Sequence, residues 1–327
     1  MGDQRDVLDP DGLYELLDDQ PSDEELGRPV LVHVLSGFVD AGQAAHLAAE
    51  HLHAIATDRV LARFDVDQLL DYRSRRPSLS FVNDHWDSLD SPLLELHLAH
   101  DSAGTPFLLL IGPEPDVQWE RFVQAVAALT VRYRVRLGVC LQAMPMAVPH
   151  TRPIGLTAHA IPSELVEGRP SWGGRVQVPG HVSGLMELRL GNAGLAMAGF
   201  VVHVPHYVAQ MKYPDAAAVL VEELNKLAGL QLSAEALLSA GRGVRRTIDT
   251  QIAEQPEVAA VVSSLERRYD TTSAGLDTTG LLGDGAHLPT GEELGAEFER
   301  FLADQGHDPD PAEEGTDPAG ESTDPST

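Results

Sequence analysis

Hydrophobic positions in the middle of the chain alternate between short apolar runs and longer segments with helical spacing. The first run, residues 30–35, is rich in β-branched residues and ends at a Ser-Gly pair, as is typical of a buried central strand. A helix is predicted directly behind it, with Asp40 and Gln43 in the spacing of a capping box. The apolar face of that helix would consist of Ala41, Ala44, Ala45, Ala48, Leu52 and Ile55.

The same alternation continues to about residue 270. Further strands are predicted at residues 60–64, 78–82, 93–98, 107–111, 135–141, 185–190 and 195–204. Further helices are predicted after Asp116, which would cap the first of them, over residues 214–227, around Leu237 and over residues 257–268. Strands separated by long helices favour a largely parallel sheet covered on both faces. The predicted fold class is therefore α/β, a three-layer α/β/α sandwich with a largely parallel sheet.

Charge is distributed unevenly along the 327 residues. The 50 acidic residues exceed the 23 Lys and Arg and give a formal net charge of −27, which argues against binding to DNA or RNA. Most of this charge lies before Leu26 and after Tyr269, so the segment between them is nearly balanced. The single Cys excludes an intrachain disulfide, and no apolar run approaches the roughly 20 residues of a membrane span. We expect a soluble, cytoplasmic protein.

These shifts in composition suggest five segments. An acidic N-terminal segment, an α/β core that contains a Gly- and Pro-rich insertion loop, a linker, an amphipathic helix and a disordered acidic tail are predicted in that order. Their bounds are 1–25, 26–270 with the loop at 170–184, 271–287, 288–305 and 306–327. The amphipathic helix would dock on its own domain or on a partner through Leu294, Phe298, Phe301 and Leu302.

The first strand-to-helix junction is a candidate ligand site. Gly37 and Gly42 would let a ligand approach the backbone closely, and a helix N-terminus presents free N–H groups. Asp40, however, would occupy those donors if it caps the helix. A tight turn therefore explains the same residues and is the favoured interpretation.

A second group of candidate ligand-binding residues follows predicted strands, where sites in open α/β sheets collect. His150, Arg152 and His159 come after the strand at 135–141, and they are suited to binding a carboxylate or phosphate or to donating a proton. His206 and Tyr207 follow the strand at 195–204. The alternative is that these polar groups are satisfied within their own loops, with Tyr207 as a core aromatic.

No complete catalytic motif is present, and no catalytic residue, metal site or cofactor is predicted. His46, Glu50 and His53 share one helix face and offer metal-ligand chemistry, but a solvated polar face explains them equally well. Cys140 lies in an apolar strand without an adjacent base, so it is interpreted as a small buried hydrophobe.

Several ordered motifs together resemble the family of proteasome assembly chaperone 2 homologues, in its actinobacterial branch. They are Gly37-Phe-Val-Asp-Ala-Gly42, Phe64-Asp-Val-Asp67, Asp71-Tyr72-Arg73, Gly112-Pro-Glu-Pro-Asp116, Met146-Ala-Val-Pro-His150-Thr-Arg152-Pro and Pro205-His206-Tyr207-Val-Ala-Gln210. The resemblance covers about residues 13–270. It implies a fold similar to that of nucleoside phosphorylases, a homo-oligomer, and a role in assembling proteasomal rings.

Chaperones of this family commonly end in a hydrophobic-Tyr-any-residue tail, whereas this sequence ends Asp324-Pro-Ser-Thr327. Two hypotheses follow. The first is a non-catalytic assembly or interaction factor with proteasome subunits or another protein as partner. The second is a small-molecule-binding protein or enzyme on the same scaffold. Convergence of the candidate polar residues in one pocket would favour the second.

Overall fold

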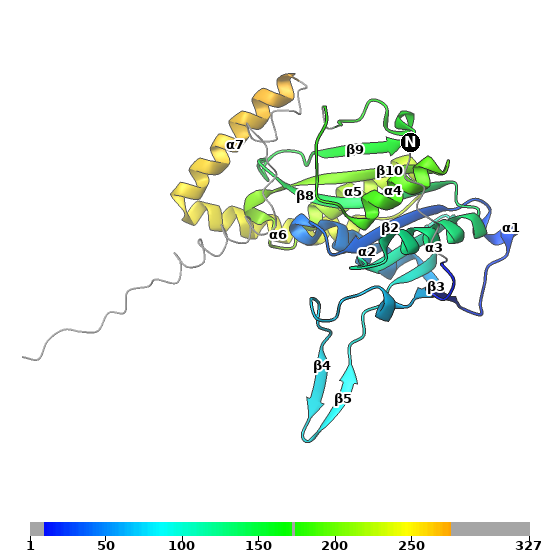
Figure 1. The fold of residues 1–327 in the computed structure, drawn as a ribbon. Coiled ribbons are helices and arrows are strands. Elements are labelled where there is room, and N and C mark those ends of the chain that lie inside the picture. Colours follow the sequence, from blue (N-terminus) through cyan, green and yellow to red (C-terminus); the bar gives the residue numbers. More distant parts are fainter. Residues whose placement is uncertain (1–9, 172–173, 276–327) are drawn as a thin grey trace, which may run out of the picture. The chain divides into compact units, whose positions relative to one another are not determined.

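The fold is built on one central sheet, seen in a computed structural model that describes residues 10–171 and 174–275 (Figure 1). Eight strands pair in the order β1-β3-β6-β7-β2-β8-β10-β9. Their bounds are β1 (Tyr14–Leu16), β2 (Val30–Ser36), β3 (Thr57–Phe64), β6 (Glu95–His100), β7 (Pro106–Pro113), β8 (Leu137–Met146), β9 (Leu156–Ile161) and β10 (Ala196–Pro205).

The middle of the sheet is parallel and its margins are antiparallel. Strands β7, β2, β8 and β10 run in one direction, while β6 and β9 flank them in the opposite direction. The crossover segments that connect the parallel strands cover both faces, as parallel sheets require. The predicted largely parallel α/β class is confirmed.

Helices form the two outer layers. On one face α2 (Ala44–Ala56) and α5 (Pro214–Ala228) pack on the sheet, and α6 (Glu235–Glu254) packs against α5. On the other face lie α3 (Trp119–Arg132) and α4 (Val182–Asn192). The short α1 (Asp23–Leu26) precedes β2, and α7 (Pro256–Gly275) follows α6. In the described part of the chain, no helix combines the length and the hydropathy needed to cross a bilayer.

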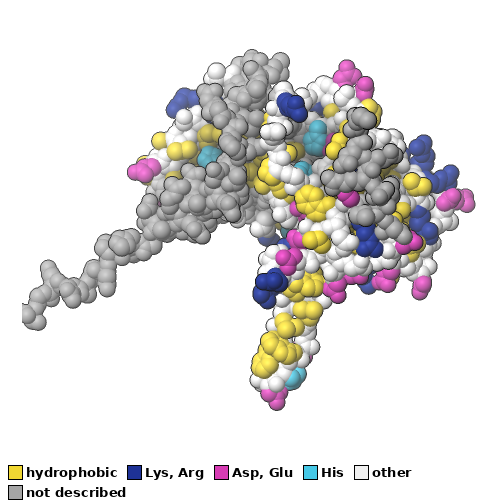
Figure 2. Space-filling model, viewed as in Figure 1, with side chains coloured by type: hydrophobic (Ala, Val, Ile, Leu, Met, Phe, Trp, Pro, Cys, Tyr) yellow, Lys and Arg dark blue, Asp and Glu magenta, His cyan; other side chains and the backbone are white. Residues whose placement is uncertain are grey.

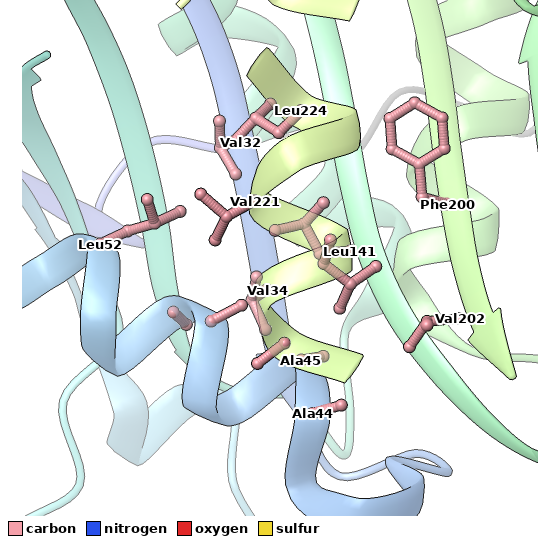
Figure 3. Packing of buried hydrophobic residues seen from close by; sticks show 14 of the residues in the cluster. Val32, Val34, Ala44, Ala45, Leu52, Leu141, Phe200, Val202, Val221 and Leu224 are labelled. Atoms are coloured by element: carbon pink, nitrogen blue, oxygen red, sulfur yellow. The ribbon is translucent and has the colours of Figure 1, made fainter. Parts of the chain in front are cut away.

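The strand periodicity of two divides the hydrophobic residues between two cores. Val32 and Val34 of β2 point to the layer of α2 and α5, where they meet Ala45, Leu52 and Val221 (Figure 3). Leu31, one position out of phase, packs in the second core with α3 and α4. His33, two positions after Leu31, therefore faces α4. The same alternation decides which residues of the other strands face the site described below.

One predicted strand is wrong. Residues 185–190 belong to helix α4, because Val182, Met186 and Leu190 are buried at four-residue spacing while Leu188 is 47% exposed. The Leu, Met, Glu and Arg of this segment are also good helix formers. Conversely, β9 and the hairpin strand β5 (His85–Leu89) lie where no strand was predicted.

The two predicted helix caps also differ in detail. Asp40 accepts hydrogen bonds from the backbone N–H groups of Ala45 (2.9 Å) and His46 (3.0 Å), across a short 3-10 turn that precedes α2. The capping box with Gln43 does not form. Asp116 does not cap α3 but accepts from the backbone N–H of Asp71 and pairs with Arg75.

The structure describes only part of the segments predicted outside the core. Within the first 25 residues, Leu13 is fully buried and β1 pairs with β3, so part of this segment belongs to the sheet. The predicted linker begins inside α7. The predicted amphipathic helix at 288–305 and the tail at 306–327 lie outside the described residues.

Candidate functional site

A row of four residues crosses the α4 face of the sheet. In the strand register, His33 of β2 is opposite Cys140 of β8, Cys140 is opposite Gly199 of β10, and Gly199 is opposite His159 of β9. Glu187 of α4 hydrogen-bonds to Nδ1 of His159 at 2.9 Å. The sheet and α4 thus gather two histidines, a thiol and a carboxylate from four elements, β2, β8, β9 and α4.

A cavity of about 420 Å³ lies beside this row, between the sheet, α4 and the loop that precedes α4. Such a volume suits a small organic ligand. Its wall is mainly apolar, with Phe38, Val176, Val178, Ile161 and Val201 among the lining residues. The polar lining side chains are Cys140, Gln142, His159, His181, Ser183 and Glu187. The loop predicted as an insertion at 170–184 therefore contributes part of the wall.

The histidine rings around the cavity are held by specific contacts. His181 stacks on Phe38 with ring centroids 4.5 Å apart, and its Nδ1 accepts a hydrogen bond from the backbone N–H of Gly184. Gly199 has no side chain, and a Cβ at this position would overlap the ring of His159. Glycine in the middle of β10 therefore makes room for the imidazole.

His33, which lies opposite Cys140 in the row, is fully buried. Neither of its ring nitrogens has a hydrogen-bond partner among the described residues. Burial lowers the pKa of His33 to about 4, opposed by the charge of Glu187. Burial likewise raises the pKa of the Cys140 thiol to about 12, so the thiol stays protonated and weakly nucleophilic at neutral pH.

Of the predicted ligand-binding residues, only His159 lines this cavity. Gly42, with φ of 66°, lies against Tyr213, whose Cβ would be 2.7 Å from an added Cβ. Gly37 similarly lies against Glu114 and Arg75. The carboxylate of Asp40 already accepts a hydrogen bond from the backbone at the start of α2. Gly37, Asp40 and Gly42 thus form the tight turn that the sequence favoured over a ligand site.

His150, Arg152 and Tyr207 gather elsewhere, near α6 and α7. The Tyr207 hydroxyl lies 2.7 Å from Nδ1 of His150, and His150 Nε2 lies 3.1 Å from Asp249 of α6. Arg152 makes two hydrogen bonds of 2.7 and 2.8 Å to Asp270 of α7. His206 contacts the ring of Tyr207 edge to face.

A groove of about 530 Å³ adjoins these residues, but its charged groups largely pair with one another. Asp215 bonds to Arg245 at 2.8 Å, in addition to the pairs of His150 and Arg152. These contacts attach α6 and α7 to the domain. The candidate residues are thus divided between two sides of the molecule and do not converge in one pocket.

Sequence reasoning missed His33, Gln142, His181 and Glu187. His33 carried a readable signal, since it is the one polar residue within the apolar run at 30–35. Glu187 was hidden by the wrong strand prediction at 185–190.

The three residues with metal-ligand chemistry on the first long helix have other partners. His46 and Glu50 pair with each other at 3.3 Å, while the ring of His53 contacts the ring of His97. The described residues contain no cluster of three or more side chains suited to a metal ion.

A second feature is the hairpin of β4 (Leu79–Val82) and β5, which protrudes from the sheet domain (Figure 1). Every residue of both strands is exposed. Phe81 and Trp86, 55% and 64% exposed, contact each other edge to face. Figure 2 shows the apolar side chains along this hairpin, which also include Leu79, Val82 and Leu89.

Known structures share this fold. A Mycobacterium tuberculosis protein of unknown function is 47% identical, with 90% of this chain and 97% of the other covered and a TM-score of 0.75. A Corynebacterium glutamicum protein of unknown function is 38% identical over 80% of this chain and 97% of its own, with a TM-score of 0.76. A proteasome-assembly chaperone homologue from M. tuberculosis is 26% identical over 71% and 99%, with a TM-score of 0.65.

No protein with a curated description matches this chain. The model of the PAC2 family, in contrast, matches residues 34–252, from the end of β2 to near the end of α6. The matched range includes Cys140, His159 and Gly199 of the four-residue row, and Glu187, but not His33. This match spans more than half of the chain. The chain belongs to the PAC2 family.

Proposed function

We propose that this protein is a non-catalytic interaction factor of the proteasome-assembly type, which acts in the cytoplasm as a homo-oligomer. The family membership and the relative described as a proteasome-assembly chaperone homologue support the type of function. The observation that carries the interaction role is the exposed apolar hairpin of β4 and β5.

A two-stranded hairpin with both faces in water has little to stabilise it. Contiguous exposed apolar side chains of this kind mark protein interfaces. Here Phe81, Trp86 and Leu89 lie on two strands whose main packing partners, in the described structure, are each other. Contact with a second protein surface would remove them from water and fix the hairpin.

A second copy of the chain fits this surface by charge. The exposed Asp84 and Asp87 lie at and near the turn of the hairpin, whereas the exposed Arg73 and Arg76 precede its first strand. In a two-fold arrangement with antiparallel hairpins, the turn of each copy lies near the base of the other. Opposite charges then meet at both ends of the apolar contact.

The oligomeric state tests this proposal. Phe81→Ser with Trp86→Ser is expected to lower the mass measured by light scattering at micromolar concentration. Val131→Ser is the matched control, because Val131 is a 78% exposed apolar residue on α3, remote in the fold from the hairpin. A monomeric wild type, or a double variant with unchanged mass, would contradict the role of the hairpin.

The assembly role has its own test. Proteasomal α- and β-subunits of M. tuberculosis, mixed with this protein, should form complete particles faster than without it, as followed by native electrophoresis. The Val131→Ser control should retain this effect. If neither the rate nor the yield of particles changes, the proteasome role is wrong, whatever the oligomeric state.

The segment at 288–305 is a further proposed docking element, through Leu294, Phe298, Phe301 and Leu302. It lies outside the described residues and stays a prediction. Phe298→Ala with Phe301→Ala should reduce the mass of the oligomer if the segment docks on a partner subunit. It should lower the melting temperature alone if the segment docks on its own domain, and an effect on neither would contradict both.

Small-molecule binding is a second candidate function, favoured by one observation, the cavity beside the His33–His159 row. Among the described residues that line the cavity, Glu187 is the one acid, and none is a Lys or Arg. Protection of the protein against heat by a bound small molecule would test this function, and the next subsection defines the molecule.

A further inference from the structure

The α4 cavity has a distinct electrostatic character. Of its described lining residues, Glu187 is the one Asp, Glu, Lys or Arg side chain. Its side chain is 12% exposed and faces His159. The fixed charge that the cavity presents to a ligand is therefore the carboxylate of Glu187.

Two of the N–H donors at the start of α4 are already used. The N-terminus of α4 adjoins the cavity, but Glu114 accepts from the backbone N–H of Val182 at 2.6 Å, and His181 accepts from that of Gly184. These two bonds, one of them to the carboxylate of Glu114, reduce what this helix N-terminus can offer to an anion. Arg75, which contacts Glu114 at this end of α4, pairs with Asp116 and donates to the backbone carbonyl of Glu114.

The carboxylate of Glu187 keeps capacity for another donor. Two carboxylate oxygens offer about four acceptor positions, and Nδ1 of His159 is the hydrogen-bond partner of Glu187 among the described residues. The unpartnered ring nitrogens of the fully buried His33 lie in the same row of the sheet. The apolar walls around these groups favour a ligand with a hydrophobic body.

We propose that this cavity binds a small organic cation, an amine with an aromatic or branched apolar body, whose ammonium group donates to Glu187. This inference rests on the second candidate function and names its ligand class. The apolar body packs against Ile161, Val201 and Phe38, and Gln142 supplies a further polar contact. A buried carboxylate that gains a charged donor forms the stronger kind of hydrogen bond.

Three probes with the same carbon skeleton test the charge. Titration calorimetry of the full chain with 4-phenylbutylamine, 4-phenylbutanol and 4-phenylbutyrate at pH 7.5 should give the highest affinity for the amine, at least tenfold above that of the carboxylate. Glu187→Gln should reduce the amine affinity at least tenfold and leave the alcohol affinity within threefold. Glu164→Gln, an exposed acid outside the lining, should leave all three affinities unchanged.

A second variant secures the location of binding. Leu188 lines the cavity and is 47% exposed, so Leu188→Trp should fill the entrance without disturbing the fold, as circular dichroism would verify. This variant should lose binding of amine and alcohol alike. Tighter binding of the carboxylate, or amine binding that survives Glu187→Gln, would overturn the cation assignment while ligand binding itself stands. Failure of all three probes to bind would overturn both the ligand class and the second candidate function.

Discussion

At the residue scale, His33 stands out among the described residues because both of its buried ring nitrogens lack a hydrogen-bond partner. Its folded pKa of about 4 lies below the value near 6.5 of the unfolded chain, chiefly because of burial. As the pH falls below about 6.5, the unfolded state takes up a proton that the folded state refuses, so stability decreases until about pH 4. Between pH 7.5 and 5 this loss amounts to about 2 kcal/mol for the one group.

We expect His33→Leu to remove this loss of folding stability at acidic pH. The variant should be at least as stable as the wild type at pH 7.5, because it also eliminates two buried nitrogens without partners. The variant's advantage over the wild type in free energy of unfolding should be about 2 kcal/mol larger at pH 5 than at pH 7.5. Urea unfolding at both pH values measures the difference, and equal pH dependence of the two proteins would contradict the assignment.

Gly199 gives a second prediction at this scale. Gly199→Ala places a methyl group where the ring of His159 lies, so the ring must move away from Glu187. Overpacking of this kind costs about 1–3 kcal/mol. Urea unfolding should show this loss. Gly243→Ala, on an open part of α6, is the control that should cost nothing. A fully stable Gly199→Ala protein would mean that His159 is not fixed in its place.

At the element scale, the apolar runs were sufficient to predict the strands that are buried on both faces. Residues 30–35 and 135–141 correspond to β2 and β8, because a strand covered on both faces is continuously apolar. Residues 185–190 misled the prediction, since Met186, Leu188 and Leu190 alternate like a strand although only tertiary packing places Leu188 in solvent. Residues 156–161 gave no strand signal because β9 forms the sheet edge and carries polar side chains.

The site was less predictable than the fold for a related reason. His159 was identified, but its partners depend on register and on α4, which single-chain spacing does not encode. His150 and Arg152 were chosen because they follow a buried strand. Their charges instead face α6 and α7, two helices whose docking cannot be read from local sequence.

The docking of α7 is testable. Arg152 bonds to Asp270 and lies 3.3 Å from Glu266, and the Tyr269 hydroxyl donates to the carbonyl of Pro153 at 3.0 Å. We expect Arg152→Ala to accelerate amide hydrogen exchange in α7 by several-fold while exchange in β2 and β8 stays unchanged. Arg175→Ala, a change of an exposed arginine in another loop, is the control. Unchanged exchange in α7 would show that other contacts hold this helix.

At the scale of the whole molecule, the two hydrophobic cores lie on opposite faces of one sheet, and both include residues of β2, β6, β7 and β10. Loss of either core would expose one face of the shared sheet, so neither core is independent of the other. The prediction is a single cooperative transition for the sheet domain in calorimetry, with equal calorimetric and van't Hoff enthalpies. Two resolved transitions in the Phe81→Ser, Trp86→Ser protein would contradict this coupling.

The register of the four-residue row has a consequence for comparing relatives. The row is specified by one residue from each of four strands, and none of these residues is needed for the alternation that defines the fold. A descendant of the same ancestor can therefore lose the chemistry of the cavity through one substitution and still be recognised as a family member. Under the proposed ligand assignment, we expect positions 33, 140, 159 and 199 together with position 187 to separate relatives by ligand chemistry, a division that overall similarity does not reveal.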